Sequence, residues 1–278
     1  MDHQSGFFKG PGNVDIFHQC WKPSQEASAV ILVIHGMGEH SSRYMNVVNH
    51  FVPKGYAVYA FDHIGHGRSG GTRKFVRTFD DFLHPLNRYL GMIKSMEPER
   101  PIFILGHSMG GAITLSYLLN HPDAGTGVIL TGPAIKPRDD IPLFTYVIGR
   151  ILAQILPRTR IVDVDINGIS RDPAVIEASL NDPLSCKKGL TARLASELLD
   201  AMDDNLARAG EIHLPTLILQ GGDDRLVDPE GAQMLYDRLG TEDKTLKVYD
   251  ALFHEVINEP EHQEVLQDME TWLARRMI

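Results

Sequence analysis

The sequence has only two cysteines, no excess of basic residues and no long hydrophobic run. Cys20 and Cys186 lie far apart and in no metal-binding spacing, so we expect two free thiols in a reducing compartment and no disulfide framework. The 27 Lys and Arg against 36 Asp and Glu give a formal net charge of −9, which argues against nucleic acid as a partner. No apolar stretch is long enough to span a bilayer. The opening MDHQSGFFKGPG also lacks the basic and apolar segments of a secretory leader. These absences predict a soluble, cytoplasmic protein.

What the sequence does contain is a series of short aliphatic segments bounded by Gly, Pro or Asp. They are continuous rather than alternating, as in strands that are buried on both faces of a parallel sheet. Helical spacing of apolar residues follows at 47–52, 82–93 and 109–120. Alternation of strand and helix predicts an α/β fold with a mostly parallel, doubly wound sheet. The predicted strands are Ala29–Gly36, Tyr56–Asp62, Pro101–Gly106, Gly127–Gly132, Thr216–Gly221 and Leu246–Tyr249.

This alternation stops between about residues 135 and 209, where the pattern is helical and contains no clear buried strand. We therefore expect a core formed by 1–134 and 210–278, interrupted by a helical cap or lid insertion at 135–209. Ligands of open α/β sheets bind at the carboxyl ends of the strands. The insertion is predicted to cover that end.

The segment Gly106-His107-Ser108-Met109-Gly110 fits the pattern G-x-S-x-G between a strand and a helix. A sharp strand-to-helix turn strains the serine backbone and requires small flanking residues, and it exposes the hydroxyl at the positive end of a helix. The alternative is a serine that only caps the helix. Strand, turn and helix together favour Ser108 as a nucleophile.

A serine nucleophile needs a base and a group that orients the base, and in this architecture the acid and the histidine follow the serine along the chain. Asp223, Asp224 and Asp228 come just after a predicted strand, and periodicity does not choose between the first two. His254 follows the last predicted strand, whereas His262 falls at the polar start of the final helix. We expect His254 to be the base.

Two backbone N–H groups must bind the oxyanion of the tetrahedral intermediate. One is expected from Met109, directly after the nucleophile, and the other from Met37 in the loop His35-Gly36-Met37-Gly38. We expect no metal site. His63 and His66 have no third ligand nearby in the sequence, and the segment after His254 lacks the second histidine of a zinc helix.

Six segments of the chain resemble, in order, the segments of monoacylglycerol lipases of the α/β-hydrolase fold. The resemblance implies that Asp224, rather than Asp223, is the acid beside Ser108 and His254. It also implies that the residues from Glu39 to Arg43 bind glycerol at the polar end of the pocket. Glu39 and Arg43 could equally form an ordinary i,i+4 ion pair. Some family members carry a histidine three residues after the catalytic one, where this chain has Ile257. The six segments are HGMGEHSSRY, FDHIGHGRSGG, GHSMGGAI, NDPLSCKKGL, LILQGGDDRLVDPEGA and DKTLKVYDALFHE.

The sequence and the resemblance together predict a serine hydrolase that cleaves monoacylglycerol to a fatty acid and glycerol without a cofactor. A lysophospholipase or short-chain carboxylesterase would use the same residues. A peptidase is disfavoured, because no acidic cluster is clearly placed to hold a substrate amine. A non-catalytic ligand-binding protein is disfavoured as well, because it would not need the complete set of catalytic residues. The apolar stretch 141–157 is either a buried core helix or a lid helix. As a lid it would touch the acyl chain and make transient contact with a membrane or micelle. The sequence does not reveal the oligomeric state.

Overall fold

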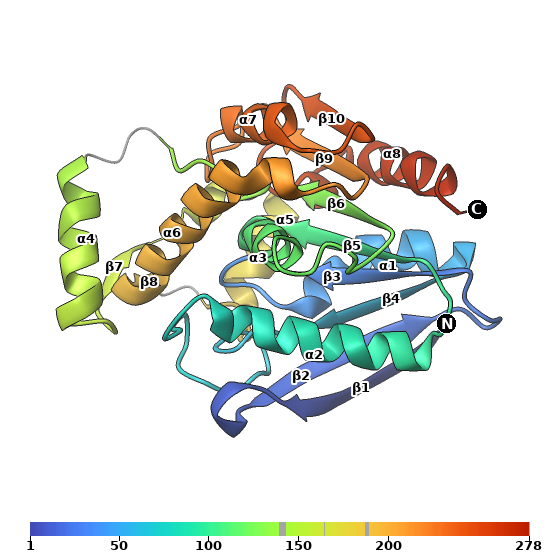
Figure 1. Cartoon of the computed structure of the whole chain (residues 1–278), viewed down its shortest axis with the longest axis horizontal. Helices are drawn as coiled ribbons and strands as arrows, with labels where there is room; N and C mark the ends of the chain where they lie inside the picture. Colours follow the sequence, from blue (N-terminus) through green and yellow to red (C-terminus); the bar gives the residue numbers. More distant parts are fainter. Residues whose placement is uncertain (139–142, 164, 187–188, 278) are drawn as a thin grey trace.

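An eight-stranded sheet forms the middle of the molecule, in the order β1-β2-β4-β3-β5-β6-β9-β10 (Figure 1). The computed structural model describes residues 1–138, 143–163, 165–186 and 189–277. Six neighbouring strands of this sheet run parallel, namely β4, β3, β5, β6, β9 and β10, whereas β1 and β2 are antiparallel to their neighbours. The strands are β1 (Asp2–Lys9), β2 (Asp15–Lys22), β3 (Ala29–Ile34), β4 (Tyr56–Phe61), β5 (Ile102–His107), β6 (Gly127–Thr131), β9 (Thr216–Gly221) and β10 (Lys244–Tyr249).

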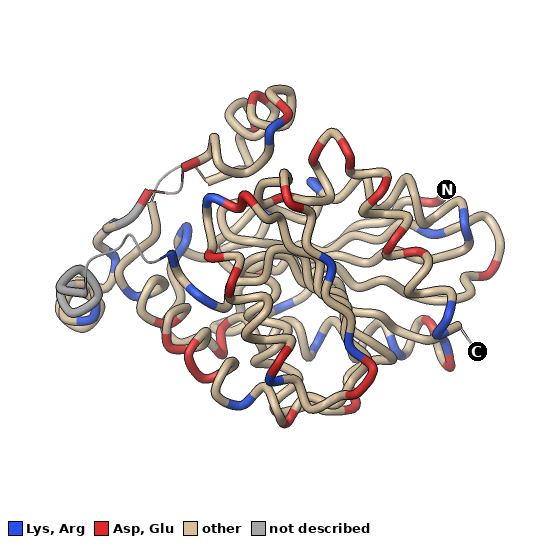
Figure 2. The backbone as a smooth tube through the Cα atoms, turned by 90° about the horizontal axis from the view of Figure 1, so that it is seen from above, with Lys and Arg blue, Asp and Glu red and all other residues tan. Residues whose placement is uncertain are grey.

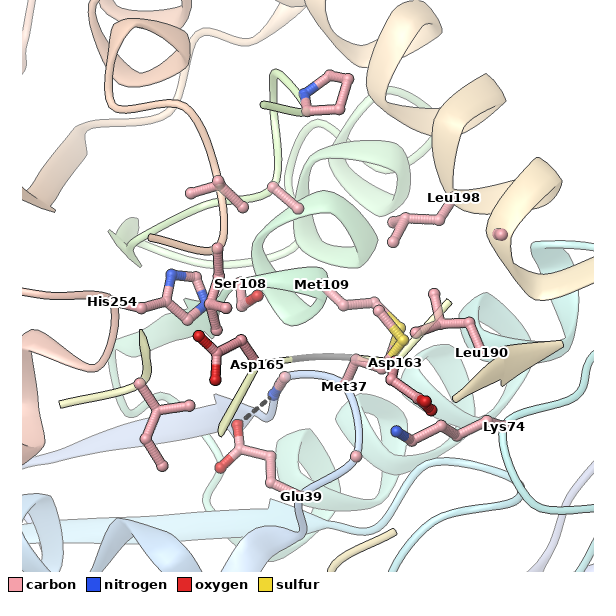
Figure 3. A pocket seen from close by; sticks show the side chains of 18 of the residues that line it. Met37, Glu39, Lys74, Ser108, Met109, Asp163, Asp165, Leu190, Leu198 and His254 are labelled. Atoms are coloured by element: carbon pink, nitrogen blue, oxygen red, sulfur yellow. Dashed lines mark hydrogen bonds between the residues drawn. The ribbon is translucent and has the colours of Figure 1, made fainter. Parts of the chain in front are cut away.

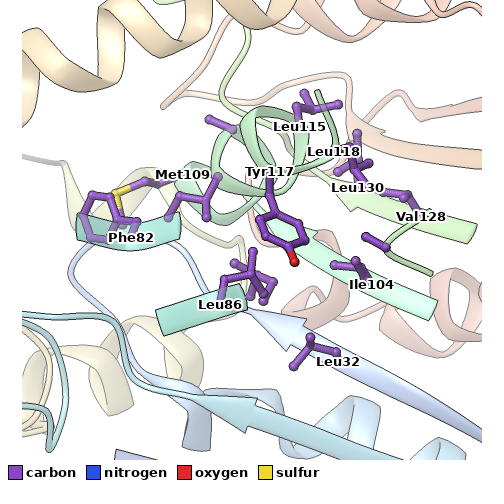
Figure 4. Close-up of a cluster of buried hydrophobic side chains, with 14 of the residues drawn as sticks. Leu32, Phe82, Leu86, Ile104, Met109, Leu115, Tyr117, Leu118, Val128 and Leu130 are labelled. Carbon is purple, nitrogen blue, oxygen red and sulfur yellow. The ribbon is translucent and has the colours of Figure 1, made fainter. Parts of the chain in front are cut away.

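Helices cover both faces of this sheet because its central strands are apolar on both faces. In β3, Leu32 packs on the side of α2 (Asp80–Met96) and α3 (Met109–Leu118), and Ile31 and Val33 pack on the opposite side. Figure 4 shows the first of these two cores, with Phe82 and Leu86 of α2 beside α3 and the strands. The second core is closed by α1 (Met45–Phe51) and α8 (His262–Ala274). The predicted doubly wound α/β fold is therefore confirmed.

Two strands lie outside the predicted set. β1 and β2 pair antiparallel at one edge of the sheet. Only one side chain of β1, that of Phe8, is buried, so the strand has no aliphatic run for a pattern to detect. Pro85 lies inside α2, five residues after its first residue.

The segment between β6 and β9 contains three helices and a short two-stranded ribbon within its described residues. The helices are α4 (Leu143–Ile155), α5 (Pro173–Asn181) and α6 (Ala192–Arg208), and the ribbon pairs β7 (Arg160–Val162) with β8 (Leu190–Thr191). The sequence did not predict the ribbon. α6 packs against α3, and α4 packs against α6 at the end of the molecule where the parallel strands finish (Figure 1). Part of the apolar stretch, 141–142, falls outside the described residues.

The end of α4 exposes large apolar side chains to solvent, unlike a helix that is buried in a core. Ile151 is 52% exposed and Ile155 is 71% exposed, and Leu156 directly after the helix is also exposed. Among the described residues, no helix has the length and apolar character needed to cross a membrane. Figure 2 shows basic and acidic residues interspersed over the described chain. Apolar surface, rather than basic charge, therefore distinguishes the outside of α4.

Candidate active site

Ser108 stands alone between β5 and α3, in a backbone conformation that side chains rarely adopt. Its φ is 52° and its ψ is −120°, the strained geometry expected of a sharp strand-to-helix turn. The Ser108 N–H donates to the carbonyl oxygen of Thr131 in the neighbouring strand β6, at 3.1 Å. The serine is thus fixed at the carboxyl end of the central strands and at the amino end of α3.

The glycines around Ser108 are required by close packing. A Cβ atom on Gly110 would lie 2.0 Å from the carbonyl oxygen of Ile34 in β3, and one on Gly106 would lie 2.6 Å from Thr114 Oγ1. Neither distance is compatible with a real side chain, so α3 can pack this closely on the sheet only with glycine at these positions. The G-x-S-x-G pattern is therefore a consequence of the turn.

The His254 imidazole is held by Asp224. His254 Nδ1 donates to Asp224 Oδ2 at 2.7 Å, and both residues are buried. Asp224 Oδ1 accepts the backbone N–H groups of Leu226 and Val227 at 2.8 and 3.1 Å, and Gln220 Nε2 donates to Oδ2 at 3.0 Å. Every polar atom of this carboxylate is engaged, which fixes the orientation of the imidazole.

The structure distinguishes Asp224 from the other acidic candidates. The Asp223 side chain is exposed and lies beside Arg225, and Asp228 pairs with Lys136 at 2.7 Å. His262 Nδ1 donates to the carbonyl oxygen of Glu259 at 2.8 Å, and His262 Nε2 lies 3.1 Å from Gln263 Nε2, so both ring nitrogens are engaged by neighbours in the chain. Asp224 is therefore the carboxylate that the fold places against His254, a choice the residue pattern left open.

Burial and charge act in opposite directions on this pair. Burial lowers the pKa of His254, but the Asp224 carboxylate outweighs burial, and the net shift of the pKa is upward. For Asp224, burial raises the pKa, yet the charge and hydrogen bond of His254 and the two backbone N–H groups leave it below its usual value. The pair is thus arranged to stabilise an imidazolium beside a carboxylate.

A cavity of about 410 Å³ joins these residues, within the usual size range of small-molecule sites. Ser108, His254, Met37 and Met109 line it, and Figure 3 shows them around one space. Apolar side chains of the segment between β6 and β9 form much of the remaining wall. They include Ile161, Ile169, Leu190, Leu198, Leu199 and Met202. Met37 and Met109 stand where the sequence expects them, and their N–H groups as oxyanion donors stay a prediction.

Glu39 and Arg43 also line the cavity, and they belong to a larger buried cluster. Glu39 Oε1 accepts the Gly36 N–H at 2.6 Å and the Tyr44 hydroxyl at 2.8 Å. Arg43 Nε lies 3.5 Å from Glu39 Oε2, and Arg43 Nη2 lies 2.7 Å from Glu255 Oε2. Glu39 and Arg43 therefore line the cavity and also form an ion pair, whereas His40, Ser41 and Ser42 are not among the described lining residues. Glycerol binding by this stretch stays a prediction.

Glu255 was missed by sequence reasoning, although it directly follows His254. Its pairing with Arg43 spans 212 residues, and no local pattern signals such a contact. The Glu255 N–H donates to the carbonyl oxygen of Ile169 at 2.7 Å, which ties the His254 loop to the segment between β6 and β9. Ile257 is buried in the second core and is not among the described residues that line the cavity.

His35, which is distant in the sequence, lies beside His63 and His66. The rings of His35 and His63 are 4.1 Å apart between centroids. The His63 N–H donates to His35 Nε2 at 2.9 Å, and His63 Nε2 donates to the His35 carbonyl oxygen at 3.0 Å. Among the described residues, no group of three or more His, Cys, Asp or Glu side chains is arranged to hold a metal ion. These contacts fasten the loop that carries Met37 to the loop after β4.

Comparisons with known proteins agree with this geometry. The model of the family "Serine aminopeptidase, S33" matches residues 25–261. A monoacylglycerol lipase of Mycolicibacterium smegmatis is 35% identical over 270 residues, which cover 97% of this chain and 96% of that protein. The crystal structure of the Paleococcus ferrophilus monoacylglycerol lipase superposes with a TM-score of 0.84 at 26% identity, covering 99% of this chain and 100% of that one. A soluble variant of the Saccharomyces cerevisiae monoglyceride lipase, in complex with a substrate analog, gives 0.85 at 27% identity over 98% and 94%. The resemblance seen in the sequence is confirmed.

Proposed function

The chain belongs to the serine aminopeptidase, S33, family of hydrolases, and from that premise we propose that it hydrolyses monoacylglycerols to a free fatty acid and glycerol. One observation carries the proposal. Ser108 and His254 line a single cavity with a largely apolar wall, and Asp224 holds His254 from behind. The similarity to monoacylglycerol lipases over nearly the whole chain supports the same substrate class.

The proposed reaction proceeds through an acyl-enzyme. His254 Nε2 takes the proton from Ser108 as the serine oxygen attacks the ester carbonyl, and Asp224 stabilises the imidazolium. The N–H groups of Met37 and Met109 bind the oxyanion. His254 then gives its proton to the departing glycerol oxygen. Water, activated by the same histidine, releases the fatty acid.

Glu39 and Arg43 are proposed to serve the alcohol end of the substrate. Because Glu39 Oε1 binds the Gly36 N–H, this carboxylate also fixes the loop that presents Met37. Arg43 Nε is buried and makes no hydrogen bond within the described structure, and it lies 3.5 Å from Glu39 Oε2. Arg43 is therefore proposed to act on the alcohol end as a cation in the cavity wall. Arg43 remains charged, since burial lowers its pKa but Glu255 and Glu39 raise it by more.

The segment 135–209 is proposed to act as a lid that guides the acyl chain. Its inner side chains line the cavity, and the outer face of α4 exposes Ile151 and Ile155. Apolar area of this kind supports weak, reversible contact with a lipid surface. Sedimentation with phosphatidylcholine vesicles should fall when both isoleucines are changed to serine, while hydrolysis of a micelle-free ester stays unchanged. Equal sedimentation of both proteins would contradict this role.

A substrate panel tests the proposed function against its rivals. We expect kcat/KM for monooleoylglycerol to exceed that for lysophosphatidylcholine, p-nitrophenyl butyrate and an aminoacyl p-nitroanilide. Ser108→Ala should abolish both turnover and labelling by a fluorophosphonate. Faster turnover of the lysophospholipid or the anilide would replace the proposal with a lysophospholipase or a peptidase. Labelling that persists in Ser108→Ala would remove Ser108 as nucleophile.

A further inference from the structure

The cavity wall contains a buried cation that the proposed mechanism does not use. Lys74 is 2% exposed, yet it lines the same cavity as Ser108. Within the described part of the chain its amine makes no hydrogen bond and no ion pair. Lysine is rarely this buried unless its charge is matched by a partner. A cation that lines a cavity without one is a candidate for ligand recognition.

The fold holds Lys74 firmly at this position. Its backbone φ is 52°, a value that non-glycine residues rarely adopt. The Lys74 carbonyl oxygen accepts the Thr191 hydroxyl at 2.6 Å, and the Lys74 N–H donates to the Gly65 carbonyl oxygen at 3.3 Å. Contacts from the core and from the segment between β6 and β9 thus fix the residue on both sides. Its amine lies against Gly38, since a Cβ on that glycine would be 3.0 Å from Lys74 Nζ.

The charges around the amine leave room for an anion. Burial lowers the pKa of Lys74, Cys186 raises it, Arg160 lowers it further and Asp163 raises it. Cys186 is thus the neighbour that raises this pKa most, and Asp163 is the neighbouring carboxylate. Asp163 is exposed, and no ion pair between it and Lys74 is found among the described residues. Figure 3 shows Lys74 beside Asp163 and Leu190, on the opposite side of Met37 from His254.

We propose that Lys74 binds an acidic group of the substrate, a carboxylate or a phosphate, so that the enzyme accepts anionic esters as well as neutral ones. This inference rests on the proposed ester hydrolysis and extends its substrate class. The position beside Leu190 places the acidic group on the apolar side of the cavity. There it is separated from the Glu39 and Arg43 cluster that is proposed to hold glycerol.

The test compares three matched esters, because the acidic group can come from either half of the substrate. The neutral reference is 1-decanoylglycerol. The first acidic ester is the glycerol monoester of decanedioic acid, whose acyl chain ends in a carboxylate, and the second is 1-decanoylglycerol 3-phosphate. Each is assayed with the unchanged enzyme, with Lys74→Met, which keeps the length but removes the charge, and with Lys74→Arg.

We expect Lys74→Met to lower kcat/KM for at least one acidic ester ten- to a hundred-fold, mainly through KM, which is the usual worth of a hydrogen bond to a charged group. Hydrolysis of 1-decanoylglycerol should stay within about threefold, and Lys74→Arg should restore much of the loss. The ester that responds identifies the source of the acidic group. An unchanged ratio of acidic to neutral kcat/KM in Lys74→Met would overturn the inference.

Binding separates this inference from the proposed function. With Ser108→Ala, calorimetry measures the affinity for the two acidic esters without turnover, and Lys74→Met in that background should weaken it ten-fold or more. If the unchanged enzyme hydrolyses none of the three esters while this affinity difference persists, the proposed function fails and the anion site stands. If hydrolysis is normal and the affinities are equal, the anion site fails alone. Asp163→Asn is the control. If Lys74 served only to pair with Asp163, then Asp163→Asn would weaken binding of the acidic esters as much as Lys74→Met does.

Discussion

Acid should destabilise this protein well above the pH at which carboxylates titrate, because of His63 and His66. Both rings are almost fully buried. Burial is the main cause that lowers the pKa of His63 to about 3 and of His66 to about 4, and the neighbouring His66 lowers that of His63 further. Both are therefore neutral in the folded protein throughout the physiological range.

The sign of the effect follows from the unfolded state, in which a histidine has a pKa near 6.5. Above about pH 6.5 neither state binds the proton, so stability is unaffected. Below it only the unfolded chain does, and each further pH unit costs about 1.4 kcal/mol per histidine until the folded pKa is reached. At pH 5 this amounts to about 2 kcal/mol for each ring and about 4 kcal/mol for both, against a typical total stability of 5–15 kcal/mol.

Other groups change this figure in known directions. His254 has a raised pKa when folded, so its contribution is present below the unfolded pKa and is lost as the pH rises through the folded one. It offsets part of the acid loss. Carboxylates with lowered pKa, such as Asp224, lose their contribution only below about pH 4. The window from pH 5 to 6.5 thus isolates the histidines.

Urea unfolding at pH 7.5, 6.5, 5.5 and 5.0 measures the effect. Between pH 6.5 and pH 5 the free energy of unfolding should fall by about 4 kcal/mol because of His63 and His66. His35 and His107, whose pKa burial also lowers, add to this loss, and His254 offsets part of it. His66→Gln, which cannot be protonated, should remove about 2 kcal/mol of that fall, even if its stability at pH 7.5 is lower. A free energy of unfolding that is equal at pH 5 and 7.5, or a slope that is unchanged in His66→Gln, would refute the reasoning.

Three further predictions concern the catalytic pair and the serine turn. Asp224→Asn should lower kcat about 10⁴-fold, with fluorescence-monitored unfolding as the control for folding; a loss below tenfold would exclude Asp224 as the orienting acid. Because the pKa of His254 is raised, kcat/KM should fall as the pH drops through this pKa, which lies above 6.5. NMR titration of the imidazole should show a lower pKa in Asp224→Asn, because burial then acts without the carboxylate. Gly110→Ala should abolish activity and cost 1–3 kcal/mol of stability or more, because its Cβ would lie 2.0 Å from the Ile34 carbonyl oxygen; full activity in that variant would contradict the packing at the turn.

The parts of this protein that the sequence predicts well are those whose cause is local. The six aliphatic runs became six strands of the main sheet. Five of them are buried at every position, and strands buried on both faces are apolar throughout. The sixth, β10, is an edge strand in which only Tyr249 is buried. The serine turn was recognisable because its glycines and its nucleophile are neighbours in the chain. β1 escaped detection since only Phe8 of its side chains is buried, and an exposed edge strand places no apolar requirement on its sequence.

The parts that required coordinates are those decided by distant contacts. Asp223 and Asp224 are adjacent and chemically identical, and only the loop geometry that aims one of them at His254 separates their roles. The His35 ring reaches His63 across 28 residues, so no local motif could reveal that the two belong together. Glu255 was overlooked for the same reason, because its partner Arg43 lies far away in the chain.

The cavity itself shows why substrate specificity is harder to predict than chemistry. In the proposed reaction, the attack on the ester uses Ser108 and backbone N–H groups at the ends of core strands, positions that the sheet dictates. The wall that contacts the rest of the substrate comes largely from the segment between β6 and β9 and from the loop that carries Lys74. The ribbon residue Thr191 fixes the Lys74 backbone through one hydrogen bond. If Lys74 binds the substrate as proposed, a small change in that segment would shift this buried side chain while His254 and Asp224 stay in place. Specificity could then vary on this fold without any change in mechanism.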